Sequence, residues 1–154
     1  MRSGPVKKTL KPADALFKSK LVARVITHIM RDGKKSVAEG VVYGALEKLD
    51  KDKKVALEMF ENAVKNVMPK LEVRSRRVGG ATYQVPSPVR YERSETLAVR
   101  WIIGAARKKK GKPITDKLFE ELRNAQQGIG DAIKKRDDVH KMAEANKAFS
   151  HFKF

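Results

Sequence analysis

The chain has 154 residues, no cysteine and a formal net charge of +17. This length is enough for one domain with a single core, and the hydrophobic fraction of 41% indicates a globular chain rather than a disordered basic tail. The lack of cysteine excludes disulfides and thiolate zinc sites, and no stretch predicts a signal peptide or a membrane span, so a cytosolic protein fits best. The charge predicts a polyanionic partner without choosing among RNA, DNA and an acidic membrane.

The basic charge is concentrated in two blocks of the sequence. Residues 1–35 carry a net charge of +8, and residues 70–112 carry +9, with twelve Lys or Arg against three acids. Residues 36–69 and 113–154 are close to neutral, at −1 and +1. This distribution predicts a basic tail and a basic face on an ordinary scaffold.

Residues 1–18 form a predicted basic arm that contains Gly4, two prolines and several lysines and orders only on a partner. Its candidate phosphate contacts are Arg2, Lys7, Lys8 and Lys11; a merely solubilising tail is the alternative.

Three helices are predicted before the second basic block. Ser19 caps the first, which runs to Asp32 and ends at Gly33. Ser36 and Glu39 are predicted to form a capping box for the second helix, which runs to Leu49, and the third helix covers residues 55–68. Lys34 and Lys35 lie in the turn before the second helix, whose free N–H groups could hold a phosphate with them; a solvated turn is the alternative. The predicted buried face of the second helix comprises Val37, Val41, Val42, Ala45, Leu46 and Leu49.

A β-hairpin is predicted from Leu71 to Val89. The alternation up to Val78, a Gly79-Gly80 turn and a second strand from Ala81 to Val85 predict its register. Pro86 and Pro88 cannot donate ladder hydrogen bonds, so this strand is an edge or ends there. Counting outward from the turn pairs Val78 with Ala81, Arg76 with Tyr83 and Arg74 with Val85. The guanidinium groups of Arg74, Arg76 and Arg77 suit phosphates, and the Tyr83 ring suits a base. A solvated hairpin is the alternative.

Three more helices and an aromatic tail complete the chain. Ser94 is predicted to cap the fourth helix, and Thr115 is predicted to cap the fifth helix, which runs to Gln127. The sixth helix covers about residues 131–145 and has a thin apolar stripe of Ala132, Val139 and Ala143. The phenylalanines 149, 152 and 154 are either tucked onto the body or available to a neighbour. The fold class is mainly α, a single domain of about six helices with a protruding β-hairpin between helices 3 and 4. We expect the boundaries 1–18 for the arm, 19–148 for the helical domain with hairpin 71–89, and 149–154 for the tail. The basic residues expected on the fourth helix and its end are Arg93, Arg100, Arg107, Lys108, Lys109 and Lys110.

No catalytic or metal site is predicted. The three histidines have no acid cluster at metal-ligand spacing, no phosphate-binding glycine loop is present, and no serine has an obvious His/Asp set. We therefore expect neither enzyme activity nor a cofactor.

The chain resembles, over essentially its whole length, the bacterial form of the universal small-subunit ribosomal protein seven family. The resemblance rests on several motifs in the family's order, while the N-terminal arm and the ending at Phe154 depart from it. These motifs are SKLV (19–22), IMRDGKK (29–35), NVMP (66–69), RRVGGATYQVP (76–86), KKR (134–136) and HKMAEANKAF (140–149).

The resemblance implies a primary binding protein of the 3′ major domain of 16S rRNA that nucleates assembly of the head of the small (30S) subunit, in the cytoplasm. It implies proximity to exit-site tRNA and mRNA, contact with small-subunit proteins nine and eleven and, in some members, repression of the protein's own operon. The basic residues listed above and Tyr83 would then contact rRNA, and Gly79 and Gly80 would form the tip nearest mRNA and tRNA. The tRNA-proximal residues on the sixth helix would be Lys134, Lys135, Arg136, His140 and Lys141.

From the residues alone, two other functions remain open. An architectural DNA-binding protein would place the β-arm in the minor groove, and competition by DNA against RNA distinguishes it. An RNA-processing enzyme would show magnesium-dependent cleavage that one acidic substitution abolishes, and we expect no turnover.

Overall fold

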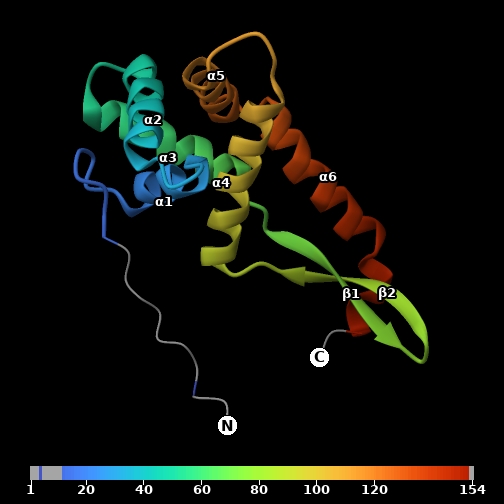
Figure 1. Cartoon of the computed structure of the whole chain (residues 1–154). Helices are drawn as coiled ribbons and strands as arrows, with labels where there is room; N and C mark the ends of the chain where they lie inside the picture. Colours follow the sequence, from blue (N-terminus) through green and yellow to red (C-terminus); the bar gives the residue numbers. More distant parts are fainter. Residues whose placement is uncertain (1–3, 5–11, 153–154) are drawn as a thin grey trace.

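The computed structural model describes residue 4 and residues 12–152, and Figure 1 shows a helical body from which a β-hairpin projects. The predicted fold class, mainly α with a hairpin between the third and fourth helices, is confirmed. None of the helices in the described ranges is long and apolar enough to cross a membrane. The elements are α1 (Lys20–Ile29), α2 (Lys35–Leu49), α3 (Lys53–Val67), β1 (Leu71–Val78), β2 (Ala81–Pro88), α4 (Tyr91–Lys108), α5 (Ile114–Gln126), α6 (Asp131–Ala145) and the 3₁₀ helix η1 (Lys147–Phe152).

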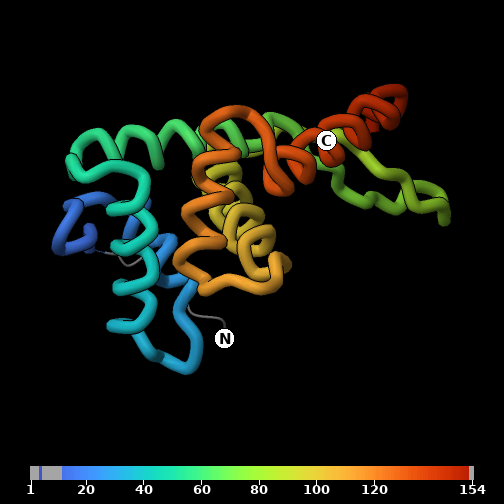
Figure 2. The backbone as a smooth tube through the Cα atoms, turned by 90° about the horizontal axis from the view of Figure 1, so that it is seen from above, coloured from blue at the N-terminus to red at the C-terminus, as the bar shows by residue number. Residues whose placement is uncertain are grey.

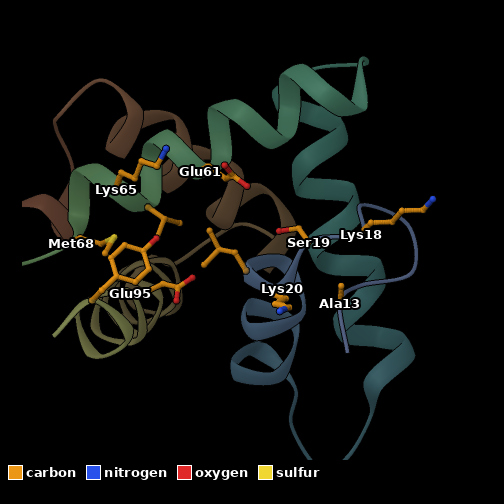
Figure 3. A pocket seen from close by; sticks show the side chains of 11 residues that line it. Ala13, Lys18, Ser19, Lys20, Glu61, Lys65, Met68 and Glu95 are labelled. Atoms are coloured by element: carbon orange, nitrogen blue, oxygen red, sulfur yellow. The ribbon is translucent and has the colours of Figure 1, made fainter. Parts of the chain in front are cut away.

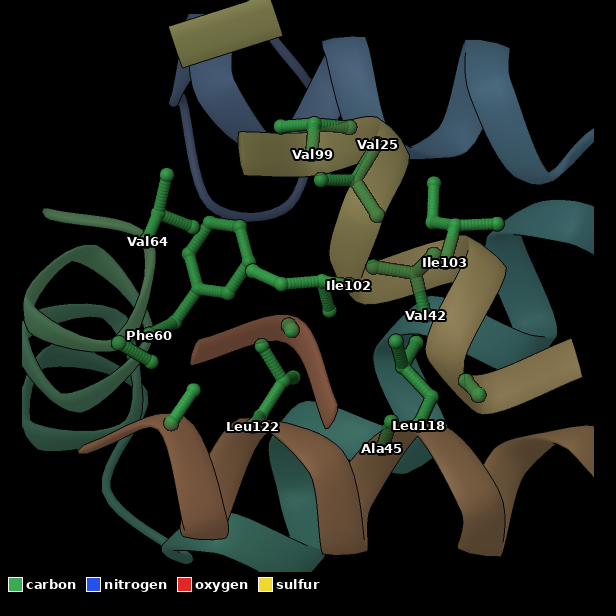
Figure 4. Packing of buried hydrophobic residues seen from close by; sticks show 14 of the residues in the cluster. Val25, Val42, Ala45, Phe60, Val64, Val99, Ile102, Ile103, Leu118 and Leu122 are labelled. Carbon is green, nitrogen blue, oxygen red and sulfur yellow. The ribbon is translucent and has the colours of Figure 1, made fainter. Parts of the chain in front are cut away.

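The core lies where the first five helices meet, with α4 running through the body (Figure 4). Ile102 and Ile103 of α4 are each 3% exposed, because this helix contacts α1, α3, α5 and α6. Phe60 of α3 and Leu122 of α5 are equally well buried. Burial of each such side chain contributes about 1.5–3 kcal/mol, so this cluster stabilises the helical body.

Three predicted helix starts are wrong. Helix α2 begins at Lys35 without a side-chain cap, so the capping box does not form, and the buried face starts at Ala38 while Val37 is 62% exposed. Helix α4 begins at Tyr91, and Ser94 lies buried in its first turn instead of capping it. The Ser94 hydroxyl donates to the Pro69 carbonyl at 2.7 Å, a tertiary bond that no local pattern encodes. Helix α5 begins at Ile114, so Thr115 lies inside it.

The structure also differs from the prediction at the end of the first helix and at the start of the third helix. Helix α1 ends at Ile29, because Asp32 and Gly33 both have positive φ and form the turn into α2. Helix α3 starts two residues early at Lys53, where the Asp52 side chain accepts the Lys54 N–H at 2.9 Å. The bounds of α6 are as predicted.

The hairpin register is the predicted one. Val78 pairs with Ala81, Arg76 with Tyr83 and Arg74 with Val85, around the Gly79-Gly80 turn. Both turn glycines have positive φ, 57° and 93°, where a side chain would be strained. Strand β2 continues through both prolines to Pro88, which is possible because a two-stranded sheet consists of edges only.

The described end of the predicted arm packs on α2. The Asp14 carboxylate accepts the N–H groups of Leu16 and Phe17, both at 3.0 Å, and the Tyr43 hydroxyl at 2.6 Å. The rings of Phe17 and Tyr43 lie 5.9 Å apart. The predicted phosphate contacts Arg2, Lys7, Lys8 and Lys11 lie outside the described residues.

Candidate nucleic-acid interface

The hairpin is supported by the C-terminal part of the chain. Figure 2 shows the hairpin and the end of α6 projecting together from the body, and α6 and η1 both contact the strands. The Tyr83 ring lies 5.3 Å from the Phe149 ring and 5.0 Å from the Phe152 ring. Two of the three tail phenylalanines therefore pack on the hairpin, and the half-buried Tyr83 ring, predicted to stack on a base, contacts them.

Glu72 organises the base of the hairpin. Arg74 Nε donates to its Oε1 and Arg93 Nε to its Oε2, both at 2.7 Å. Burial alone would raise the pKa of Glu72, but the hydrogen bonds and charges of Arg93 and Arg74 outweigh it and hold the pKa below its ordinary 4.5. The Glu72 side chain is 9% exposed, whereas those of Arg74 and Arg93 are 59% and 53% exposed. Both guanidinium groups thus face solvent while anchored from behind.

Farther out on the hairpin, the two remaining arginines point to opposite faces. Arg76 shares the face of Arg74 by strand alternation, and Arg77 lies on the other face, opposite Thr82. Both arginines are exposed, as are the tip glycines 79 and 80.

The basic residues on α4 and after it have distinct roles. Arg107 donates to the Ile29 carbonyl at 3.1 Å, which satisfies an orphan group at the end of α1. The Lys109 Nζ lies 2.8 Å from Oε2 of the fully buried Glu121, in an ion pair that is not a well-directed hydrogen bond. Arg100, Lys108 and Lys110 are exposed.

Two of the predicted residues on α6 hold this helix to the body. Arg136 contacts Asp137 and donates to the Asn66 carbonyl, and His140 Nε2 accepts the Lys70 N–H at 3.0 Å. They therefore fix α6 against the junction between α3 and β1. Lys134, Lys135 and Lys141 are exposed.

The predicted phosphate site before α2 consists of exposed residues. Lys34 is the N-cap residue, and Lys35 Nζ lies 3.3 Å from Glu39 Oε1 one turn further on. An exposed pair at i,i+4 contributes about 0.3–0.5 kcal/mol, so Lys35 is held only weakly.

A cavity of about 390 Å³ opens between α1, α3 and α4 (Figure 3). Lysines 18, 20 and 65 line it with Glu61 and Glu95, and Glu95 also pairs with Arg24. Sequence reasoning missed this group, because its members come from separate elements.

Sequence reasoning also missed Glu72 and Glu121, the two buried acids that hold predicted RNA contacts. The position of Glu72, two residues before Arg74 on the same strand face, was a usable signal. Glu121 gave none, because its partner Lys109 lies in the loop after α4, twelve residues earlier in the sequence.

The fold and the surface together define a class: a helical domain with a supported basic hairpin. Among residues 4 and 12–152, no group of three or more histidines and acids is arranged to hold a metal ion.

The chain belongs to the family described as ribosomal protein S7p/S5e, whose pattern it matches over residues 1–147. It is similar to the small ribosomal subunit protein uS7 of Fervidobacterium nodosum, with 56% identity over 142 residues and 92% of each chain covered. The protein of the same description from Pelagibacter ubique is 52% identical, over 96% of this chain and 95% of its own. That from Pelotomaculum thermopropionicum is 50% identical over 99% of both chains.

Proposed function

We propose that this protein is a structural, non-catalytic constituent of the small ribosomal subunit in the cytoplasm. Relatives that carry the description small ribosomal subunit protein uS7 match nearly the whole chain at 50–56% identity, which supports this role. Its ligand would be the 3′ major domain of 16S rRNA, whose folding in the subunit head it would nucleate.

The observation that carries the proposal is the separation of charges in the basic block. Glu72 is buried beneath two arginines, and Glu95 faces Arg24 and is 15% exposed in its side chain. Two of the three acids of this block thus lie inward, whereas Glu92 is exposed, as is every Lys and Arg of the block except Lys109. The exposed cations whose side chains make no hydrogen bond or ion pair with another described residue include Arg77, Arg100, Lys108, Lys110, Lys134, Lys135 and Lys141.

Such a surface binds RNA chiefly by neutralising phosphates, which makes its affinity dependent on salt. Specificity would come from the shape of the RNA and a few unstacked bases. The exposed tip at Gly79 and Gly80 would approach exit-site tRNA and mRNA, with the lysines of α6 nearby. Small-subunit proteins nine and eleven would be its protein neighbours, and the same surface would serve repression of its own messenger.

A salt-dependent titration tests the proposal. It compares a 16S 3′ major-domain fragment with a scrambled RNA and a duplex DNA of equal length. The variant Arg77→Ala/Arg100→Ala loses two cations of the proposed surface, and Lys53→Ala/Lys54→Ala loses two exposed cations at the start of α3. We expect the first variant to weaken cognate binding roughly tenfold per lost contact and to lower the salt slope by about one per contact.

The control variant should bind as the wild type does. Equal binding of the wild type to all three nucleic acids would reject the ribosomal proposal in favour of non-specific or architectural binding. Equal losses in both variants would mean that only the total charge matters.

A further inference from the structure

Glu72 is an acid buried beneath a surface that otherwise needs positive charge. On charge alone it opposes RNA binding, because it cancels one of the two arginines that it contacts. Its burial and its two contacts of 2.7 Å suggest a different role. We propose that Glu72 is a positioning residue that holds the guanidinium groups of Arg74 and Arg93 in the orientation in which they receive RNA phosphate groups.

The two arginines come from different elements, and Glu72 is their shared contact. Arg74 is on β1, and Arg93 is in the first turn of α4, beyond the whole hairpin in sequence. Each carboxylate oxygen of Glu72 accepts the Nε–H of one arginine. Each arginine is therefore held through Nε, the guanidinium nitrogen nearest its own backbone. For Arg93, this leaves the terminal N–H groups to a ligand; for Arg74, Nη2 also lies 2.6 Å from Oε1.

The arrangement suits phosphate because a guanidinium group binds its oxygens through two parallel N–H donors. A long side chain that is already oriented loses less conformational entropy on binding than a free one. The carboxylate itself stays ionised at neutral pH, because the pKa of Glu72 lies below its ordinary value under the influence of both arginines. The occupant is thus an RNA backbone segment at the base of the hairpin, and this inference rests on the proposed function.

The decisive variant is Glu72→Gln, because the charge effect and the positioning effect predict opposite changes in RNA affinity. The change raises the net charge from +17 to +18, which by itself strengthens RNA binding. If Glu72 positions the arginines, binding of the 16S 3′ major-domain fragment should instead weaken about tenfold, while binding of a scrambled RNA stays the same or strengthens. The control is Glu58→Gln, the same change at an exposed acid on α3, and it should not weaken cognate binding.

The ratio of the affinity for the cognate RNA to that for the scrambled RNA distinguishes the two possible effects of the substitution. A loss of folded protein lowers both affinities in proportion and leaves the ratio unchanged, whereas a loss of positioning lowers the ratio. If Glu72→Gln tightens cognate binding as Glu58→Gln does, the inference is overturned. If Glu72→Gln does not fold, the variant Arg93→Lys provides the test. It keeps the positive charge but not the paired N–H donors, so cognate binding should fall while the salt slope stays the same. Unchanged cognate binding of Arg93→Lys would also overturn the inference. Wild type that does not prefer the cognate fragment would instead reject the proposed function.

Discussion

The ammonium group of Lys109 lies 2.8 Å from a carboxylate oxygen of Glu121, a residue with no exposed surface. The other oxygen of Glu121 accepts the Ala132 N–H at 3.0 Å. One buried acid therefore joins the loop after α4, helix α5 and the first turn of α6. Lys109 lies in a run of three lysines and is the one whose charge is used inside the protein.

Replacing Lys109 by methionine should destabilise the fold strongly. It leaves the Glu121 carboxylate buried without its counter-charge, and breaking such a pair costs about 3 kcal/mol. Chemical denaturation at neutral pH measures the loss. The control is Lys108→Met, because Lys108 is exposed, and we expect a change within about 0.5 kcal/mol. Equal effects of the two substitutions would show that the ion pair contributes nothing.

The contribution of Glu72 to stability should depend on pH. Its pKa is lower in the folded protein than the ordinary 4.5, so its stabilising effect is present above that pH and disappears as the pH falls through the folded pKa. Glu72→Gln should therefore reduce the free energy of unfolding by about 1–2 kcal/mol at pH 7, and by progressively less as the pH falls below 4.5. Thermal or urea unfolding over a series of pH values from 7 downward tests this, with Glu58→Gln as the control. A cost that is independent of pH would argue against the ionised contact.

Phe152 should restrain the outer part of the hairpin. Its ring packs on Tyr83, and an aromatic pair contributes about 0.5–1.5 kcal/mol beyond burial. We expect Phe152→Ala to accelerate amide hydrogen exchange in β1 and β2 around Tyr83 but not in α2. Val37→Ala, which shortens an exposed side chain on α2, should leave exchange in the hairpin unchanged. Unaltered protection in Phe152→Ala would show that the tail does not stabilise the hairpin.

Two glycine-to-alanine substitutions should change stability in opposite directions. Gly130 has a φ of 109°, and an added Cβ would lie 3.0 Å from Glu121 Oε1, so Gly130→Ala should cost about 1–3 kcal/mol. Gly40 lies inside α2 with no atom near its added Cβ, so Gly40→Ala should stabilise by about 0.5–1 kcal/mol. Thermal unfolding of both variants provides the comparison, and a stabilising Gly130→Ala would contradict the strained geometry.

The hairpin and the existence of the helices were predictable because their signals are local. Period-two alternation and the Gly79-Gly80 turn specify a register between neighbouring strands, and an apolar stripe specifies a helix wherever it recurs. The boundaries of α6 followed from Gly130 and the length of the pattern. The helix starts at Ser36, Ser94 and Thr115 were wrong. For Ser94 the reason is a tertiary bond, because its hydroxyl donates to the Pro69 carbonyl instead of capping the helix.

The sequence by itself determined the helical class, the hairpin register and the two blocks of positive charge, since each depends on neighbours along the chain. Only the tertiary structure decided which cations bind groups of the protein itself. Arg107, Lys109 and Arg136 look like their exposed neighbours in the sequence, yet each satisfies a carbonyl or carboxylate group from a distant element. The physical reason is that a buried polar group must find a partner, and packing alone determines which long side chain reaches it.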